Sequence, residues 1–195
     1  MPPLSKSAKI LLLASSLWYF GEGLFGPLFA VFAEKVGGDI MDITWAWSLY
    51  LIVTGIAYVA IGKLFNRTKW KSKLIVIGYA LNTLFTFAYL LVDNTIDLLL
   101  VQVGLGLAEA VSTPAWDASF ASELEDTNDT FLWGIANGQS FFVSGIAIAI
   151  GGLIANYISF DALFILMGSI QFLATIIQAR TAFGKSHTIT ANPGL

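Results

Sequence analysis

The sequence of 195 residues has no cysteine and a single histidine, His187. Disulfide frameworks, thiolate nucleophiles and cysteine metal sites are therefore excluded. It contains neither a Walker loop nor a Gly-x-Gly-x-x-Gly segment, so we expect no ATP hydrolysis by this chain. There is no excess of basic residues, because the net charge is −3, and nucleic acid is not an expected partner. We expect a protein that is not an enzyme and has no metal or other cofactor.

Charged residues are also scarce, at 12% of the chain, whereas 56% of residues are hydrophobic and the mean hydropathy is +0.76. A soluble domain contains about 25% charged residues, and about 20 consecutive apolar residues cross a bilayer core about 30 Å thick. Six charge-poor intervals are long enough, at residues 10–33, 44–62, 74–92, 98–120, 130–160 and 162–179. We therefore expect an all-α integral membrane protein, with a six-helix transmembrane domain at residues 1–182 and a polar cytoplasmic tail at residues 183–195.

The ten basic residues lie almost entirely on one side of this topology. Lys6 and Lys9 precede the first interval, five more separate the second from the third, and Arg180 and Lys185 follow the sixth. Only Lys35 falls on the opposite side. By the positive-inside rule, we expect a multi-pass protein of the cell (inner) membrane with both termini in the cytoplasm.

Two segments share the same spacing of glutamate and proline: EGLFGP from Glu22 to Pro27 and EAVSTP from Glu109 to Pro114. In both, the proline follows the glutamate by five positions. A second similarity has nearly the same separation along the chain. Residues 55, 56, 57, 62 and 66 are identical to residues 145, 146, 147, 152 and 156. If each repeat contains three spans, the second copy is inverted relative to the first. Such a 3+3 inverted repeat is typical of alternating-access transporters.

Glu22 and Glu109 lie inside the expected first and fourth spans, each about 20 Å from one face of the membrane. A charged group there costs about 2.5 to 3.5 kcal/mol or more, which makes a lipid-facing position unfavourable. Burial and a neighbouring acid both disfavour the charged form of a carboxyl group, which suits a proton carrier. We expect both glutamates to couple protons to substrate in one cavity. The alternative is that each is a neutral acid bonded to a neighbouring helix.

Pro27 and Pro114 each follow one of these glutamates by five positions. Proline removes a helical hydrogen bond and bends a helix about one turn before itself, which is here the turn that carries the acid. We therefore expect a helix break at the cavity in both spans. The alternative is a kink that serves packing alone, as many membrane helices tolerate.

The loop after the second span resembles the signature of the major facilitator superfamily, a Gly-x-Leu-x-Asp-Arg-x-Gly-Arg-Lys-type loop between helices two and three. Gly62, Leu64, Arg67 and Lys71 match it, whereas Asn66 replaces the usual acid and positions 69 and 70 also differ. The segment 113–118 is similar to members of the same superfamily. This resemblance covers residues 9–182 and implies half of a twelve-helix major facilitator fold, namely its N-terminal six-helix half.

In that superfamily the loop latches the two halves together, with its arginine paired to an acid at the end of helix four. The resemblance therefore implies a cytoplasmic gating loop in this chain, formed by Gly62, Asn66, Arg67, Lys71 and Asp117. Arg67 would pair with Asp117 or, as an alternative, with Glu123. The charge cluster could instead serve only to determine topology.

These features predict a secondary active transporter that is proton-coupled and works as a parallel homodimer of half-size units. A second, different half-transporter chain is the alternative partner. Another possibility is a membrane interaction or assembly protein that keeps the half-transporter fold without transport. A stable complex with another membrane protein, without any flux of protons or solute, would distinguish this role from transport.

No basic residue lies between Lys9 and Lys35, between Lys35 and Lys63 or between Lys73 and Arg180, so no fixed cation enters the expected cavity. An anionic substrate would have to rely on helix N-termini while facing the acids. We therefore expect a cationic or neutral, partly apolar small molecule. Aromatic side chains near the first acid offer stacking or cation–π contacts, unless they only pack against lipid or other helices. They are Trp18, Tyr19, Phe20 and Phe25.

Overall fold

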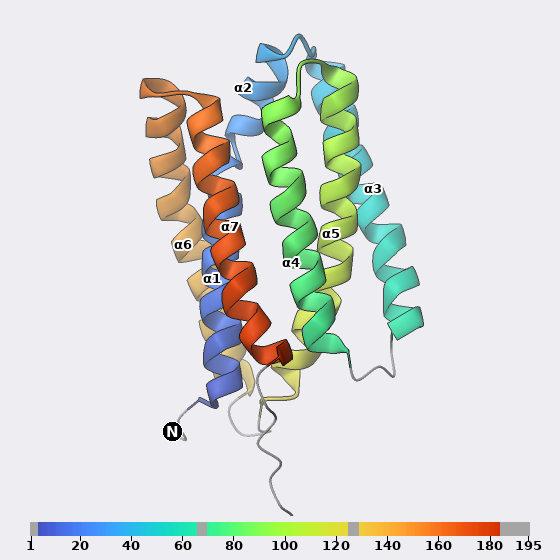
Figure 1. Ribbon diagram of the computed structural model, residues 1–195, viewed down its shortest axis with the longest axis vertical. Coiled ribbons are helices and arrows are strands. Elements are labelled where there is room, and N and C mark those ends of the chain that lie inside the picture. The colour runs from blue at the N-terminus through green and yellow to red at the C-terminus, as the bar shows by residue number, and fades with distance from the viewer. Residues whose placement is uncertain (1–3, 66–69, 125–128, 184–195) are drawn as a thin grey trace, which may run out of the picture.

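The computed structural model describes residues 4–65, 70–124 and 129–183, which form seven α-helices and one 3-10 helix (Figure 1). Five helical segments are long and apolar enough to cross a membrane. They are α3 (Ile40–Phe65), α4 (Lys71–Ala88) continued by the 3-10 turn η1 (Tyr89–Leu91), α5 (Thr95–Ala121), α6 (Asp129–Tyr157) and α7 (Phe160–Phe183). These five segments coincide with the second to sixth intervals predicted from the sequence.

The first predicted interval is not one helix but two, α1 (Lys6–Phe25) and α2 (Leu28–Lys35). The hydroxyl of Ser5 caps the start of α1 by accepting the backbone N–H of Ala8 at 2.9 Å. The chain leaves α1 at Gly26, whose N–H still donates to the carbonyl of Glu22 at 3.2 Å. Pro27 has no backbone N–H and therefore cannot continue the hydrogen bonds of α1. It is instead the N-cap of α2.

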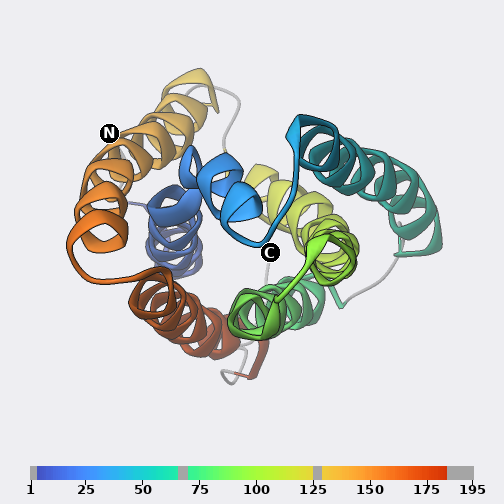
Figure 2. The same ribbon diagram turned by 90° about the horizontal axis from the view of Figure 1, so that it is seen from above.

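The long helices pack against one another in a simple order: α6, α1, α7, α4, α5, α3. In both views α6 and α3 lie at opposite sides of the bundle, and from above α2 lies between them (Figures 1 and 2). The start of α1 and the end of α7 are at the same end of the molecule (Figure 1). The four inner helices α1, α7, α4 and α5 therefore form the body that positions the site.

Aromatic rings hold the broken first segment in place near the top of the bundle. Phe25 of α1 packs edge-on against Phe164 of α7, with ring centroids 5.1 Å apart, and Tyr89 of η1 stacks on the same ring at 4.9 Å. Phe32 of α2 joins them at 4.9 Å from Phe164. Each such pair adds about 0.5 to 1.5 kcal/mol beyond the area it buries, so α2 is anchored although it is short.

Gly151 lies at the contact between α6 and α1, where the two backbones approach closely. A β-carbon added at Gly151 would lie 1.9 Å from the backbone oxygen of Leu24, far inside van der Waals contact. Gly152, the next residue, faces open space, and an added β-carbon would meet nothing within 4 Å. Small residues allow membrane helices to approach closely, and Gly151 does so against the helix that carries Glu22.

Candidate functional site

Both intramembrane glutamates line one cavity of about 80 Å³ in the middle of the bundle. Glu22 comes from α1 and Glu109 from α5, and these helices run in opposite directions (Figure 1). The other lining residues are aromatic, amide or apolar: Trp18, Phe25, Gly26, Phe29, Trp47, Tyr50, Asn82, Tyr89, Gln102, Leu105 and Met167. The cavity therefore brings together residues from α1 to α5 and from α7.

Two amide side chains hold the carboxyl group of Glu22. Gln171 of α7 donates its Nε2–H to Oε1 at 2.8 Å, and Asn82 of α4 donates its Nδ2–H to the same oxygen at 3.0 Å. Both amides are buried. Gly21 makes room for this arrangement, because a β-carbon there would lie 2.7 Å from Cγ of Gln171. Within the described part of the chain, Oε1 of Gln171 is buried and has no hydrogen-bond partner.

Two hydroxyl groups hold the carboxyl group of Glu109. Thr113, one turn further along α5, donates to Oε1 at 2.8 Å, and Tyr58 of α3 donates to the same oxygen at 3.3 Å. Tyr58 and Thr113 are partly buried. Glu109 is thus held from its own helix and from the adjacent one, as Glu22 is held from two neighbouring helices.

The partners of both acids are neutral groups that can donate as well as accept hydrogen bonds. An amide presents either its NH₂ or its oxygen after rotation, and a hydroxyl does both. Such partners satisfy a carboxylate as acceptor and a protonated carboxyl group as donor. A lysine or arginine partner would instead favour only the charged form. The site is therefore suited to carboxyl groups that change protonation state.

The four predicted aromatic residues do not all reach this cavity. Trp18 and Phe25 line it. Tyr19 lines a smaller neighbouring cavity, and Phe20 packs, partly buried, against the main apolar core. Trp18 is also fixed by stacking on Tyr79, with ring centroids 5.9 Å apart and an interplanar angle of 16°.

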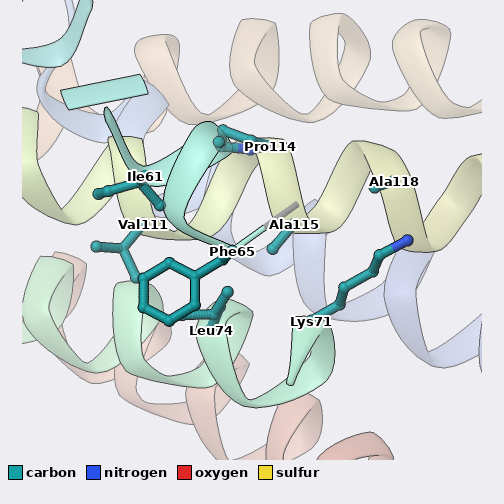
Figure 3. A pocket seen from close by; sticks show the side chains of 9 residues that line it. Ile61, Phe65, Lys71, Leu74, Val111, Pro114, Ala115 and Ala118 are labelled. Atoms are coloured by element: carbon teal, nitrogen blue, oxygen red, sulfur yellow. The ribbon is translucent and has the colours of Figure 1, made fainter. Parts of the chain in front are cut away.

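The two predicted prolines take different positions. Pro27 stands between two helices, whereas α5 continues through Pro114 without interruption. Pro114 lines a second, larger cavity of about 260 Å³, at the ends of α3 and α5 and the start of α4 (Figure 3). Its other walls are apolar apart from Lys71, whose side chain extends toward Ala118 (Figure 3). None of the described residues that line it is acidic, so it does not share the chemistry of the smaller cavity.

The predicted gating loop is only partly described. Gly62 and Lys71 both line the larger cavity, and Asp117 is exposed on α5. Asn66 and Arg67 lie outside the described residues, so the pairing of Arg67 with Asp117 or Glu123 stays a prediction. Glu123 accepts a hydrogen bond from the hydroxyl of Ser5.

Sequence reasoning did not select Asn82, Gln171 or Tyr58, which hold the two acids. An amide within an otherwise apolar span is itself a signal, because burying it without a partner costs about 1 to 3 kcal/mol. For metals, the described residues contain no cluster of three or more His, Cys, Asp or Glu side chains.

Comparison with known proteins identifies the family. Residues 11–193 match the family model of the Major Facilitator Superfamily, and the chain belongs to this superfamily. It is similar to an uncharacterized MFS-type transporter of Methanocaldococcus jannaschii, with 24% identity over 91% of this chain and 46% of the relative. It is 28% identical to the proton-coupled antiporter flippase LtaA of Staphylococcus saprophyticus, over 67% of this chain and 34% of that protein.

A further relative differs in length. The uncharacterized MFS-type transporter YitZ of Bacillus subtilis is 19% identical over 84% of this chain and 99% of the relative. By contrast, the chain spans about half or less of the archaeal and staphylococcal proteins. Together, the apolar helices and these relatives establish a multi-pass membrane protein of a transporter superfamily.

Proposed function

We propose that this protein is a proton-coupled secondary transporter in which Glu22 and Glu109 bind and release the coupled protons. The observation that carries this proposal is that both acids line one cavity and that, among the described residues, each accepts hydrogen bonds from neutral side chains that can donate or accept. Intramembrane acids usually mark ion or substrate pathways. The similarity to the staphylococcal relative, a proton-coupled antiporter flippase, adds support.

We propose six membrane spans, with α1 and α2 together forming the first, arranged as a 3+3 inverted repeat. The packing order α6, α1, α7, α4, α5, α3 supports this, because it reads the same from either end when α1 exchanges with α5, α3 with α6 and α4 with α7. This exchange also relates the two acids. The start of α1 and the end of α7 share one end of the bundle. We propose that this end faces the cytoplasm and that the protein lies in the cell membrane, a placement that the distribution of basic residues supports.

We propose a cationic or neutral, partly apolar substrate. The residues that line the acid cavity include six aromatic side chains and two acids but no lysine or arginine. Aromatic faces attract cations by about 0.5 to 2 kcal/mol, and more strongly when water is excluded. Pockets for drug-sized ligands measure about 300 to 1,000 Å³, so a cavity of about 80 Å³ holds only part of such a ligand. A partner would supply the rest of the site.

Tetraphenylphosphonium should bind this site more tightly than tetraphenylborate, which has the same shape and the opposite charge. We expect the cation to raise the melting temperature of purified protein and to inhibit flux, and both effects should decline in Glu22→Gln and Glu109→Gln. Thermal shift and competition assays with the matched pair of ions measure this directly. Preferential, acid-independent binding of the borate would overturn the assignment of substrate charge.

We propose that the partner is a second copy of this chain in a parallel C2 homodimer. Only 6% of the most apolar stretch of α3 and 11% of that of α6 are buried, against 44% to 50% in the spans formed by α4 with η1, by α5 and by α7. An apolar groove of about 570 Å³ runs along α2 and α3. The repeated glycines of α3 and α6 face open space, which suits close helix packing. They are Gly55, Gly62, Gly145 and Gly152.

The absence of native cysteine allows a direct test of this interface. A Gly55→Cys/Gly145→Cys variant should form covalent dimers under mild oxidation, because α3 of one copy would face α6 of the other. Ile77→Cys, on an exposed position of α4, is the control and should not cross-link. Native mass spectrometry in nanodiscs checks the same point. A strictly monomeric particle that transports would rule the homodimer out, and a stable complex with a different membrane protein but no flux would favour the assembly role.

A further inference from the structure

The small cavity that Tyr19 lines lies beside the cavity of Glu22 and Glu109, toward the end of the bundle where α1 begins. It measures about 20 Å³ and is lined by Ser15, Trp18, Tyr19, Tyr79, Thr113 and Trp116. Ser15 lies about two helical turns before Glu22, and Trp116 about two turns after Glu109 on the antiparallel α5, which is roughly 10 Å along the axis. Trp18 lines both cavities and is their shared wall.

Two hydrogen-bond donors around this cavity are buried and unpaired. The indole nitrogens of Trp18 and Trp116 have no hydrogen-bond acceptor among the residues that the structure describes. Leaving a buried donor without an acceptor costs about 1 to 3 kcal/mol. Two such donors at one cavity indicate that a further group accepts from both.

The size of the cavity decides what that group is. A water molecule needs about 10 to 15 Å³ of accessible space and two to four polar partners. A cavity of about 20 Å³ therefore admits one water molecule and no larger ligand.

Two hydroxyl groups at the same cavity have acceptor capacity left. Thr113 donates its hydrogen to Glu109 at 2.8 Å, which leaves its oxygen lone pairs available. Ser15 donates to the carbonyl of Leu12 at 3.0 Å and receives Nε2–H of Gln139 at 3.3 Å, which leaves one lone pair. The two indole groups and these two hydroxyl groups offer two donors and two acceptors, the full complement of a tetrahedral water, and Tyr19 and Tyr79 also line the cavity.

We propose that this cavity binds one ordered water, which accepts from Trp18 and Trp116 and donates to Ser15 and Thr113. The functional meaning of the site depends on the proposed proton coupling. A water that donates to Thr113 keeps the hydroxyl hydrogen of that residue directed at Glu109. Trp116 and Ser15 are then positioning residues, which act on Glu109 through the water and Thr113.

Nuclear magnetic resonance of protein labelled with ¹⁵N-tryptophan tests the site without any transport assay. Trp18→Phe and Trp116→Phe assign the two indole signals. Both indole protons should show cross-relaxation with a long-lived water. In Ser15→Ala/Thr113→Val, which removes both acceptors, these water contacts should disappear from both signals. Ser16→Ala is the matched control, because Ser16 also donates to the carbonyl of Leu12 but does not line the cavity.

If the double variant fails to fold, Trp116→Phe is used in its place, because it keeps an aromatic ring and removes one hydrogen-bond donor. It should weaken the water contact of Trp18 several-fold. The proposal is overturned if neither indole contacts water in the unchanged protein, or if the contacts persist in the folded double variant. The two proposals can also fail separately. If the water is present but glutamine at both acid positions leaves transport unchanged, the proposed proton coupling is contradicted and the water site still holds.

Discussion

Glu22→Gln and Glu109→Gln should each reduce pH-driven transport by more than about tenfold, which corresponds to about 1.4 kcal/mol in the limiting step. Glutamine cannot bind or release a proton in this pH range, yet its oxygen can accept the same hydrogen bonds. At position 22 these come from Asn82 and Gln171, so the fold should remain intact. Flux into proteoliposomes across an imposed pH gradient, measured over a range of pH, checks this expectation.

The matched control is Glu34→Gln, which removes an exposed carboxyl group from α2, outside the acid cavity. It should transport like the unchanged protein. Circular dichroism and gel filtration establish that each variant is folded. If the Glu22 and Glu109 variants both transport with the original pH profile, the two acids are structural and proton coupling through them is excluded.

Gly151→Ala should destabilise the protein by about 1 to 3 kcal/mol or more, the usual cost of overpacking a well-packed contact. The added methyl carbon would lie 1.9 Å from the backbone oxygen of Leu24 and 2.7 Å from its carbonyl carbon. No side-chain rotation relieves a clash with backbone, so α6 and α1 have to separate. Because α1 carries Glu22, transport should fall together with the melting temperature.

Gly134→Ala, on the same helix as Gly151, is the control and should behave in the opposite way. An added β-carbon meets nothing within 4 Å there, and alanine stabilises a helix by about 0.5 to 1 kcal/mol relative to glycine. Melting temperatures of both variants in the same detergent measure the difference. Equal losses of stability would show that α6 does not pack against α1 through Gly151.

The transmembrane segments were the most predictable part of this fold, since the bilayer itself demands long apolar intervals. The predicted interval 98–120, for example, became α5 (Thr95–Ala121), whose ends extend slightly beyond the charge-free stretch. The expected helix break is found at Pro27, where α1 gives way to α2, whereas the same expectation at Pro114 is wrong. Proline alone does not reveal whether a helix ends, as it does at Pro27, or continues, as α5 does through Pro114.

The location of the acids in one cavity was predicted from their repeated spacing, but their partners were not. Asn82 and Gln171 come from α4 and α7, and only the packing of these helices brings them to Glu22. The close approach of Gln171 also depends on Gly21, because a β-carbon there would lie 2.7 Å from Cγ of Gln171. Contacts of this kind depend on tertiary structure, which periodicity and composition do not encode residue by residue.

Proton release on substrate binding is the most direct test of the central claim, that Glu22 and Glu109 exchange protons in the cavity where substrate binds. Purified protein in weakly buffered detergent solution near neutral pH, with a pH-sensitive dye, is mixed with tetraphenylphosphonium. The account predicts release of protons that saturates with the cation and is absent from Glu22→Gln/Glu109→Gln. Binding of the cation without proton release, or equal release from that double variant, would contradict it.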